Sequence, residues 1–298
     1  MELEDLAAAL GVPVEAITGA ETIAPGSLRV RIEQAGASRE VLVRGAAGEA
    51  AGNHAAVLEA LSRAGFGAAP RLTAFAGGLM AETYEEGLSA LAVVPSATAL
   101  EAAVDAIATL HTLGLREGRR WEIPSSELVP GAGIPLHRLG FASHEREPAQ
   151  ELLASAAGVL AAGPFGFAHG ELHAGNVRFT ANGPCLAEFG AAGHGHQLFD
   201  IAAFLSTAGL EPPFRRELAE RYARRRALPP TLADAIDLAT IPWGLSWLIE
   251  LPRRQVLALG DDAATEQISM LAARTHDALR RPAGDDPLAA ALRAALWP

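Results

Sequence analysis

The sequence predicts an α+β protein of two lobes, in which a small antiparallel sheet lobe precedes a larger helical lobe. Three observations predict it. Short alternating or β-branched segments precede Gly87, apolar residues recur at helical spacing after residue 98, and polar residues at 167–204 lie among short apolar runs. We expect residues 1–86 to form the first lobe and residues 87–298 the second.

The first lobe is predicted to run strand, strand, helix, strand, strand. Residues 28–34 alternate and residues 40–44 are β-branched, and the AGAS segment between them fits a hairpin turn. Helical spacing follows over residues 48–64. Residues 69–75 and 79–87 then resemble two further strands, and the second of these ends in acidic residues and glycine.

The second lobe is predicted to be mostly helical. Apolar positions at helical spacing predict helices over residues 98–113, 145–162, 213–226 and 230–251. A loop at 282–287 then precedes a final helix. Two of the predicted helices precede the polar segment at 167–204 in the chain, and the others follow it.

That polar segment is the most informative part of the chain. It reads as a loop, a short strand, a turn, a second short strand, another loop and a helix that begins at Asp200. Carboxylates and an amide presented between apolar runs can hold a divalent cation, and a carboxylate beside that cation can take a proton from a hydroxyl. A polar surface hairpin is the alternative. The polar residues are His169, Glu171, His173, Asn176, Glu188 and Asp200.

HGELHAGNV, followed by LAEFG and FDIA, resembles the catalytic segment of the aminoglycoside phosphotransferase and choline kinase-like family. That family reads HGDLHxGNV, then IDFG, then a DxA that opens a helix. The resemblance covers roughly residues 20–255. It implies a protein-kinase-like fold and the use of ATP or GTP with Mg²⁺. Two letters differ, because Glu171 and Glu188 stand where the family has Asp.

The resemblance also implies a role for each matching residue. Glu171 would accept the proton of the acceptor hydroxyl, and Asn176 and Glu188 would hold Mg²⁺ beside the nucleotide. Arg44 matches the phosphate-contacting lysine of the third strand; this chain contains no lysine, and all 24 basic residues are arginine. His169 belongs to the same catalytic loop, where we expect it to support the loop through hydrogen bonds.

Two further groups of residues follow from the resemblance. Glu82, Thr83 and Tyr84 are the candidates for the hinge that holds the nucleotide base. His54 stands where the family usually has the glutamate that pairs with its lysine, and Glu49 is the alternative partner for Arg44.

Composition restricts the partners. The net charge of −11 argues against nucleic acid, whose phosphates need clustered cations. The single cysteine, Cys185, excludes an internal disulfide. The apolar stretch near Leu88 to Leu113 is interrupted by charged residues, so we expect no membrane span and a cytoplasmic location.

Three functions are consistent with these observations. The first is an ATP-dependent phosphotransferase that acts on a hydroxyl of a small molecule or peptide. The second is a kinase-like binding protein, or pseudokinase. The third is a tailoring protein of natural-product or modified-peptide biosynthesis that acts with a partner enzyme. Lysine has become Arg44, and the two aspartates have become Glu171 and Glu188, so the three charges keep their sign. This favours a site that still holds nucleotide and metal.

Overall fold

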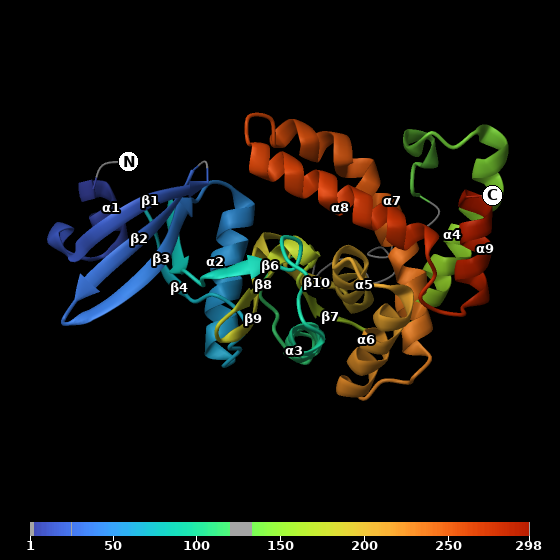
Figure 1. Cartoon of the computed structure of the whole chain (residues 1–298), viewed down its shortest axis with the longest axis horizontal. Helices are drawn as coiled ribbons and strands as arrows, with labels where there is room; N and C mark the ends of the chain where they lie inside the picture. Colours follow the sequence, from blue (N-terminus) through green and yellow to red (C-terminus); the bar gives the residue numbers. More distant parts are fainter. Residues whose placement is uncertain (1–2, 25, 120–132, 298) are drawn as a thin grey trace.

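A computed structural model describes residues 3–24, 26–119 and 133–297 (Figure 1). At one end of an elongated molecule lies a five-stranded antiparallel sheet whose strands follow the order β1-β2-β3-β5-β4. The strands are β1 (Ile17–Ala24), β2 (Ser27–Gln34), β3 (Ala37–Gly45), β4 (Leu72–Ala76) and β5 (Leu79–Thr83).

A hairpin with a two-residue turn joins β2 to β3, as the sequence predicts. Gln34 pairs with Ala37, and the two residues between them, Ala35 and Gly36, have positive φ values of 53° and 80°. Turns of this kind match the twist of the flanking strands. Apolar side chains of this sheet and of α1 (Leu3–Leu10) form a separate small core that includes Leu6, Val30 and Val41.

The chain leaves the first sheet just after β5. The next strand, β6 (Gly87–Ser89), pairs with β8 (Val177–Thr180) in a second sheet, so residues 84–86 connect the two parts. Cβ at position 87 would lie only 2.5 Å from the carbonyl oxygen of Phe179, which explains why glycine opens β6. The division of the chain after residue 86 stays a prediction.

The segment at 167–204 forms the centre of the second part. Strands β8 and β9 (Gly183–Leu186) pair as a hairpin, and β7 (Phe165–Ala168) pairs with β10 (Gly193–His196). The following helix, α5, spans Gln197–Thr207, so it begins three residues before Asp200, the predicted start. His196 caps it, because its ring accepts a hydrogen bond from the backbone N–H of Leu198.

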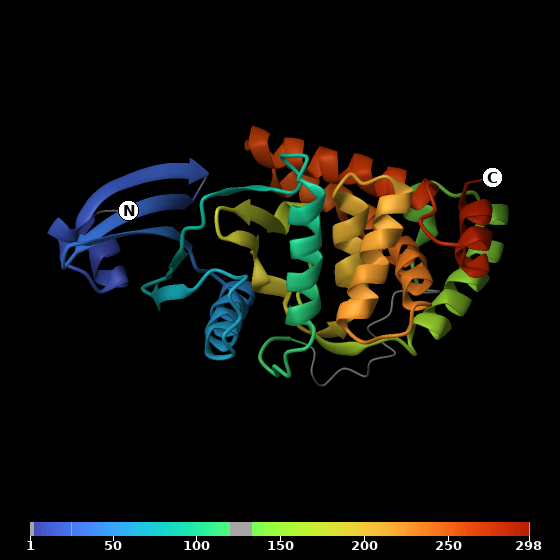
Figure 2. The same ribbon diagram turned by 60° about the horizontal axis from the view of Figure 1, so that its bottom comes forward.

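Helices pack around this centre (Figure 2). Buried leucine, isoleucine, phenylalanine and alanine side chains of these helices join the short strands and α2 in one continuous core. In Figure 2, α3 lies alongside α6, which in turn contacts α5. The helices are α2 (Glu49–Arg63) at the sheet, then α3 (Ala97–Leu110), α4 (Ser143–Leu160), α6 (Pro212–Arg225), α7 (Leu232–Leu257), α8 (Asp262–Arg280) and α9 (Pro287–Leu296).

The predicted fold class is confirmed, because an antiparallel sheet precedes a larger helical part. Six of the described α-helices and strands were not predicted: α1, β1, β6, β7, β10 and α8. The helix predicted over 230–251 continues to Leu257 and contains Pro252.

Helix α7 is long and apolar enough to cross a membrane, in place of the Leu88 to Leu113 stretch considered above. In its most apolar window 67% of the residues are buried inside the protein. Burial of this kind fits the core helix of a folded domain.

Candidate active site

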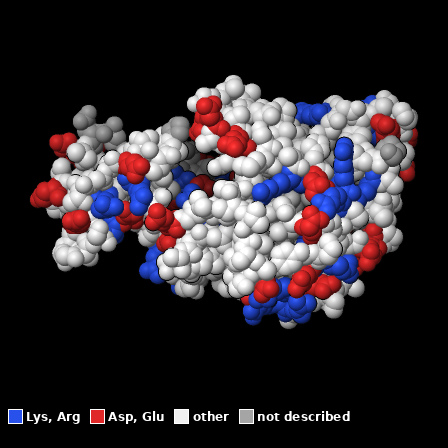
Figure 3. Space-filling model, in the orientation of Figure 1, with Lys and Arg blue, Asp and Glu red and all other residues white. Residues whose placement is uncertain are grey.

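The predicted site residues come from both parts of the molecule. The space-filling view shows a recess between the sheet and the helical part, with acidic and basic side chains inside it (Figure 3). Arg44 comes from β3, Glu171 and Asn176 follow β7, and Glu188 follows β9. Hydrogen bonds connect these residues across the junction.

Arg44 joins the two parts through a pair of carboxylates. Its Nη1 lies 2.5 Å from Oε1 of Glu188, and its Nη2 lies 2.5 Å from Oε1 of Glu82 on β5. Burial on its own would lower the pKa of Arg44, but Glu82 and Glu188 outweigh it and raise that pKa. Burial would likewise raise the pKa of Glu188, and Arg44 lowers it. Arg44 and Glu188 are therefore charged together at neutral pH.

The partner of Arg44 is thus neither of the two residues considered from the sequence. Oε1 of Glu49 lies 3.1 Å from Nε of Arg119, so Glu49 is not the substitute. His54 on α2 contacts Glu82 instead, with 2.8 Å between Nε2 and Oε2. Its ring also packs edge-on against Phe189.

Asn53, which precedes His54, is a site residue that sequence reasoning missed. Its amide nitrogen donates to the carbonyl oxygens of Phe189, Gly190 and Ala192 at 3.3, 3.1 and 2.9 Å. These carbonyls belong to the turn that follows Glu188. Helix α2 therefore binds both the partner of Arg44 and the loop that carries Glu188.

A buried network holds the loop between β7 and β8. The carboxylate of Asp200 accepts hydrogen bonds from the backbone N–H groups of His169 at 2.6 Å and Gly170 at 2.9 Å, and it lies 3.0 Å from Nε2 of His111. The ring of His169 is hydrogen-bonded to the carbonyl of Ala187 and packs at a tilted angle against Phe189. His169 and Asp200 are placed to support the loop.

Glu171 projects from this loop toward α7. Its Oε1 accepts a hydrogen bond of 2.8 Å from Nη2 of Arg254, and the guanidinium of Arg254 lies 5.6 Å from the centre of the Trp247 ring. The Glu171 side chain is 41% exposed, so substrate can reach the carboxylate. Arg254 is a second residue that sequence reasoning missed.

Asn176 and Glu188 supply oxygen atoms of the kind that Mg²⁺ prefers. The amide nitrogen of Asn176 donates to the carbonyl of Glu171 at 2.9 Å, which leaves its amide oxygen for a cation. Among the described residues, no group of three or more His, Cys, Asp or Glu side chains forms a metal cage. One carboxylate and one amide still fit Mg²⁺, which takes few protein ligands and completes its shell with water and nucleotide phosphates.

The backbone at Glu188 is strained. Its φ of 66° and ψ of 55° lie in the left-handed region, which costs a non-glycine residue about 1–2 kcal/mol. Hydrogen bonds on both sides hold the strain, because Ala187 N–H donates to the Asn176 carbonyl and Asn53 binds the turn after Glu188. Such strain gathers at functional sites, where a side chain must point in one direction.

The hinge candidates, Glu82, Thr83 and Tyr84, lie in two different environments. The side chain of Glu82 is buried and bound to Arg44 and His54, so it faces the cleft and not the connecting segment. The backbone N–H groups of Thr83 and Tyr84 donate to the carbonyls of Arg71 and Glu40 within the sheet. The carbonyl oxygens of Thr83 and Tyr84 are the groups that remain to accept a hydrogen bond from a nucleotide base. The hinge assignment stays a prediction.

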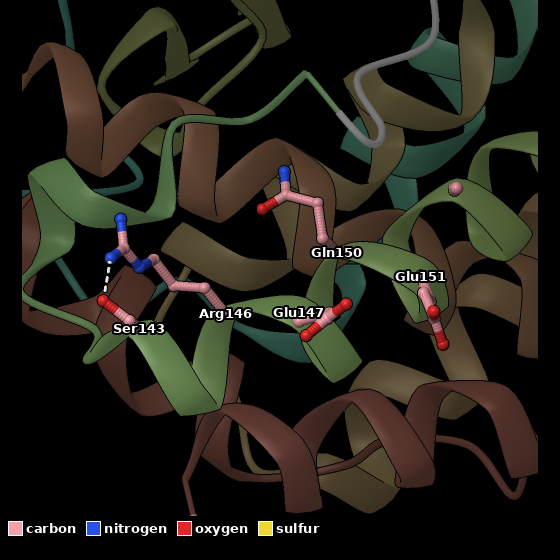
Figure 4. A pocket seen from close by; sticks show the side chains of 6 residues that line it. Ser143, Arg146, Glu147, Gln150 and Glu151 are labelled. Atoms are coloured by element: carbon pink, nitrogen blue, oxygen red, sulfur yellow. Dashed lines mark hydrogen bonds between the residues drawn. The ribbon is translucent and has the colours of Figure 1, made fainter.

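A cavity of about 500 Å³ lies elsewhere, beside α4 (Figure 4). It is lined by Ser143, Arg146, Glu147, Gln150, Glu151 and Ala154. None of the predicted site residues lines it, and it plays no part in the site.

Solved structures of similar fold cover nearly the whole chain. A choline/ethanolamine kinase family protein from Mesorhizobium loti matches with a TM-score of 0.65 and 16% identity, over 99% of this chain and 99% of that one. Choline kinase LicA from Streptococcus pneumoniae matches with a TM-score of 0.61 and 13% identity, over 92% of this chain and 97% of that one. An aminoglycoside phosphotransferase in complex with ADP and hygromycin B matches with a TM-score of 0.53 and 14% identity, over 92% of this chain and 97% of that one.

These similarities show the protein-kinase-like fold. No curated protein matches the chain. A sequence profile, that of the phosphotransferase enzyme family, matches residues 21–238, which are well over half of the chain. The chain therefore belongs to the phosphotransferase enzyme family, and it has the kinase-like fold of that family.

Proposed function

We propose that this protein transfers the γ-phosphate of ATP or GTP to a hydroxyl group of a small molecule, with Mg²⁺ as the metal. A bond forms between the acceptor oxygen and the γ-phosphorus, the bond between that phosphorus and the β-γ bridging oxygen breaks, and a nucleoside diphosphate leaves. The hydroxyl proton passes to Oε of Glu171.

One observation carries the proposal: the contact of Arg44 with Glu188, which are 144 residues apart in the chain. It brings a cation of the sheet lobe against the carboxylate that follows β9. Asn176 belongs to the same group, because its carbonyl accepts from the N–H next to Glu188 and its side chain binds the Glu171 backbone. A metal-nucleotide complex needs this combination of charges in one place.

Each site residue would have a separate role in the reaction, set by its position. Glu188 and the amide oxygen of Asn176 would hold Mg²⁺, which supplies charge neutralisation at the phosphates when it is bound. Arg44 would neutralise further phosphate charge. Arg254 would orient the Glu171 carboxylate toward the acceptor, and the Asp200 network would keep the loop in place.

A second candidate has an observation of its own. Arg254 and Arg44 each neutralise one of the two site carboxylates, Glu171 and Glu188. Both carboxylates are one methylene longer than the family pattern, which moves each by about 1–1.5 Å. A kinase-like protein that binds nucleotide without transferring phosphate would tolerate both features.

Calorimetry and turnover separate the two candidates. ATP and GTP are titrated with and without Mg²⁺, and nucleoside diphosphate release is then measured with choline, ethanolamine and hygromycin B, the compounds named for the similar structures. Mg²⁺-dependent binding with acceptor-stimulated release supports the transferase. Binding without release over the whole panel and a wider set of amino alcohols supports the binding protein. Failure to bind either nucleotide overturns both.

A further inference from the structure

The acidic partner of Arg44 has moved within this fold. The resemblance places that acid on the helix that follows the third strand, but α2 carries His54 there. The carboxylate that meets Arg44 comes instead from Glu82 on β5. The chain has thus kept the ion pair and changed the element that supplies its negative charge.

The sheet register explains why Glu82 reaches Arg44. β3 and β5 are antiparallel neighbours, with Leu42 opposite Glu82 and Arg44 opposite Met80. Residues two apart on a strand share a face, so Arg44 and Glu82 are diagonal neighbours on the face that α2 covers. Such neighbours are within reach of long side chains.

Glu82 is fixed in a way that Glu188 is not. Each of its two carboxylate oxygens has a partner: Oε1 binds Arg44 and Oε2 binds His54. Its side chain is 3% exposed, whereas that of Glu188 is 41% exposed. A buried carboxylate is held where its partners are, since losing them leaves an uncompensated charge. Glu188 can therefore release Arg44 and bind a metal, while Glu82 stays bound to Arg44.

We propose that Glu82, oriented by His54, is the positioning residue that aims Arg44 at the nucleotide phosphates. The proposal rests on the proposed function, because it assumes that Arg44 meets phosphate. His54 makes the link to the rest of the site, since Asn53, the next residue on α2, binds the turn after Glu188. Movement of α2 would thus displace the anchor of Arg44 and the metal-binding loop together.

The test measures the affinity for Mg²⁺-ADP by calorimetry. Glu82→Gln keeps the shape and removes the charge that holds Arg44, and we expect at least a tenfold loss of affinity. Glu33→Gln makes the same chemical change at an exposed position of the same sheet and should leave the affinity unchanged. If turnover is measured, the KM for nucleotide should rise in Glu82→Gln while the KM for the acceptor stays constant.

A rescue variant separates positioning from a loss of structure. His54→Glu combined with Glu82→Gln returns the carboxylate to α2, and we expect it to recover most of the lost affinity. Thermal unfolding identifies variants that fail to fold. If Glu82→Gln is among these, His54→Leu takes its place, because leucine offers no hydrogen-bond donor. A two- to fivefold loss is expected, since Glu82 keeps Arg44 but loses its second partner.

Three results overturn the inference. A folded Glu82→Gln that binds as tightly as the unmodified chain overturns it alone and leaves the proposed function standing. The same holds if the double variant folds but binds no better than Glu82→Gln. It holds also if His54→Leu, used in place of an unfolded Glu82→Gln, binds normally. Absence of nucleotide binding by the unmodified chain overturns the proposed function, and the inference falls with it.

Discussion

Glu171 is the residue on which the proposed chemistry depends most. It lies on a loop fixed by the buried Asp200, and its carboxylate is both exposed to substrate and held by Arg254. A carboxylate in this position can take the hydroxyl proton only while it is ionised.

Replacing Glu171 by Gln is expected to lower kcat by about a hundredfold or more, because the acceptor proton loses its destination. The dissociation constant for Mg²⁺-nucleotide should change little, since Glu171 is not among the proposed metal ligands. Steady-state kinetics and calorimetry on the same preparation measure the two effects. A Glu171→Gln variant with normal kcat would remove Glu171 from the mechanism.

Shortening both carboxylates tests whether the cleft is adapted to glutamate. In the double variant Glu171→Asp with Glu188→Asp, each carboxylate withdraws by about 1–1.5 Å from its present partner, Arg254 or Arg44. If the protein is an active transferase, its rate should fall by about a hundredfold. A rate that rises, or first becomes measurable, in the double variant would instead identify a binding protein.

Among the elements, α8 has the clearest structural task. Arg274 in its centre donates to the carbonyl oxygens of Ala90, Leu91 and Thr207, at 3.2, 3.1 and 2.8 Å. It thereby joins α8 to the end of α5 and to the residues that follow β6. Those carbonyls lie where helix and strand end, so they lack regular backbone partners.

Replacing Arg274 by Gln should lower the free energy of unfolding by about 1–3 kcal/mol, because the carbonyls lose a charged donor. Urea unfolding measures the change. Arg280→Gln, in the exposed last turn of the same helix, is the matched control and should stay within about 0.5 kcal/mol of the unmodified chain. Equal effects of the two substitutions would show that the Arg274 contacts do not stabilise the fold.

Element by element, the sequence predicts best where burial is one-sided. The β2–β3 hairpin and α3 show clear periodicity, because one face of each is buried. Strand β1 is exposed at seven of its eight positions, so it carries no strong apolar pattern. Helix α8 was missed although its buried residues, such as Leu271, Thr275 and Ala278, do recur at helical spacing. Helix α7 continues past residue 251 although proline tends to end a helix, and residues 252–257 of this extension are half-buried or exposed.

The candidate site, like the fold, is predictable from the sequence only in part. Glu171, Asn176 and Glu188 stand in the short segments HGELHAGNV and LAEFG, so the family resemblance points to them. Arg254 and Asn53 are missed because they reach the site from 83 and 136 residues away, and no local pattern records such a contact. The pairing of Glu82 with Arg44 depends on strand register, which a list of residues does not contain.

For the molecule as a whole, buried histidines set the response to acid. Burial lowers the pKa of His111, His169 and His196 below the value of 6.5 expected in the unfolded chain. As the pH falls through 6.5, the unfolded chain therefore takes up more protons than the folded chain does. Their contribution to stability is complete above that pH and is lost below it, by up to about 1.4 kcal/mol per pH unit for each histidine.

We expect the unfolding temperature to fall between about pH 6.5 and pH 5.5, before the carboxylates titrate. The pKa of Asp105 is lowered to about 2 by its hydrogen bond to Arg221, so this residue adds nothing in that range. His196→Gln should reduce the pH dependence, whereas His144→Gln, at an exposed position, should not. A flat profile over this range in calorimetric scans would contradict the assignment.

The replacement of lysine by Arg44 also determines which reagents can detect the protein. Nucleotide probes that acylate an active-site amine find no lysine anywhere in this chain, so a survey of kinases by such labelling would pass over it even if every molecule held nucleotide. A dicarbonyl reagent, which condenses with guanidinium groups, is the chemistry suited to this cleft.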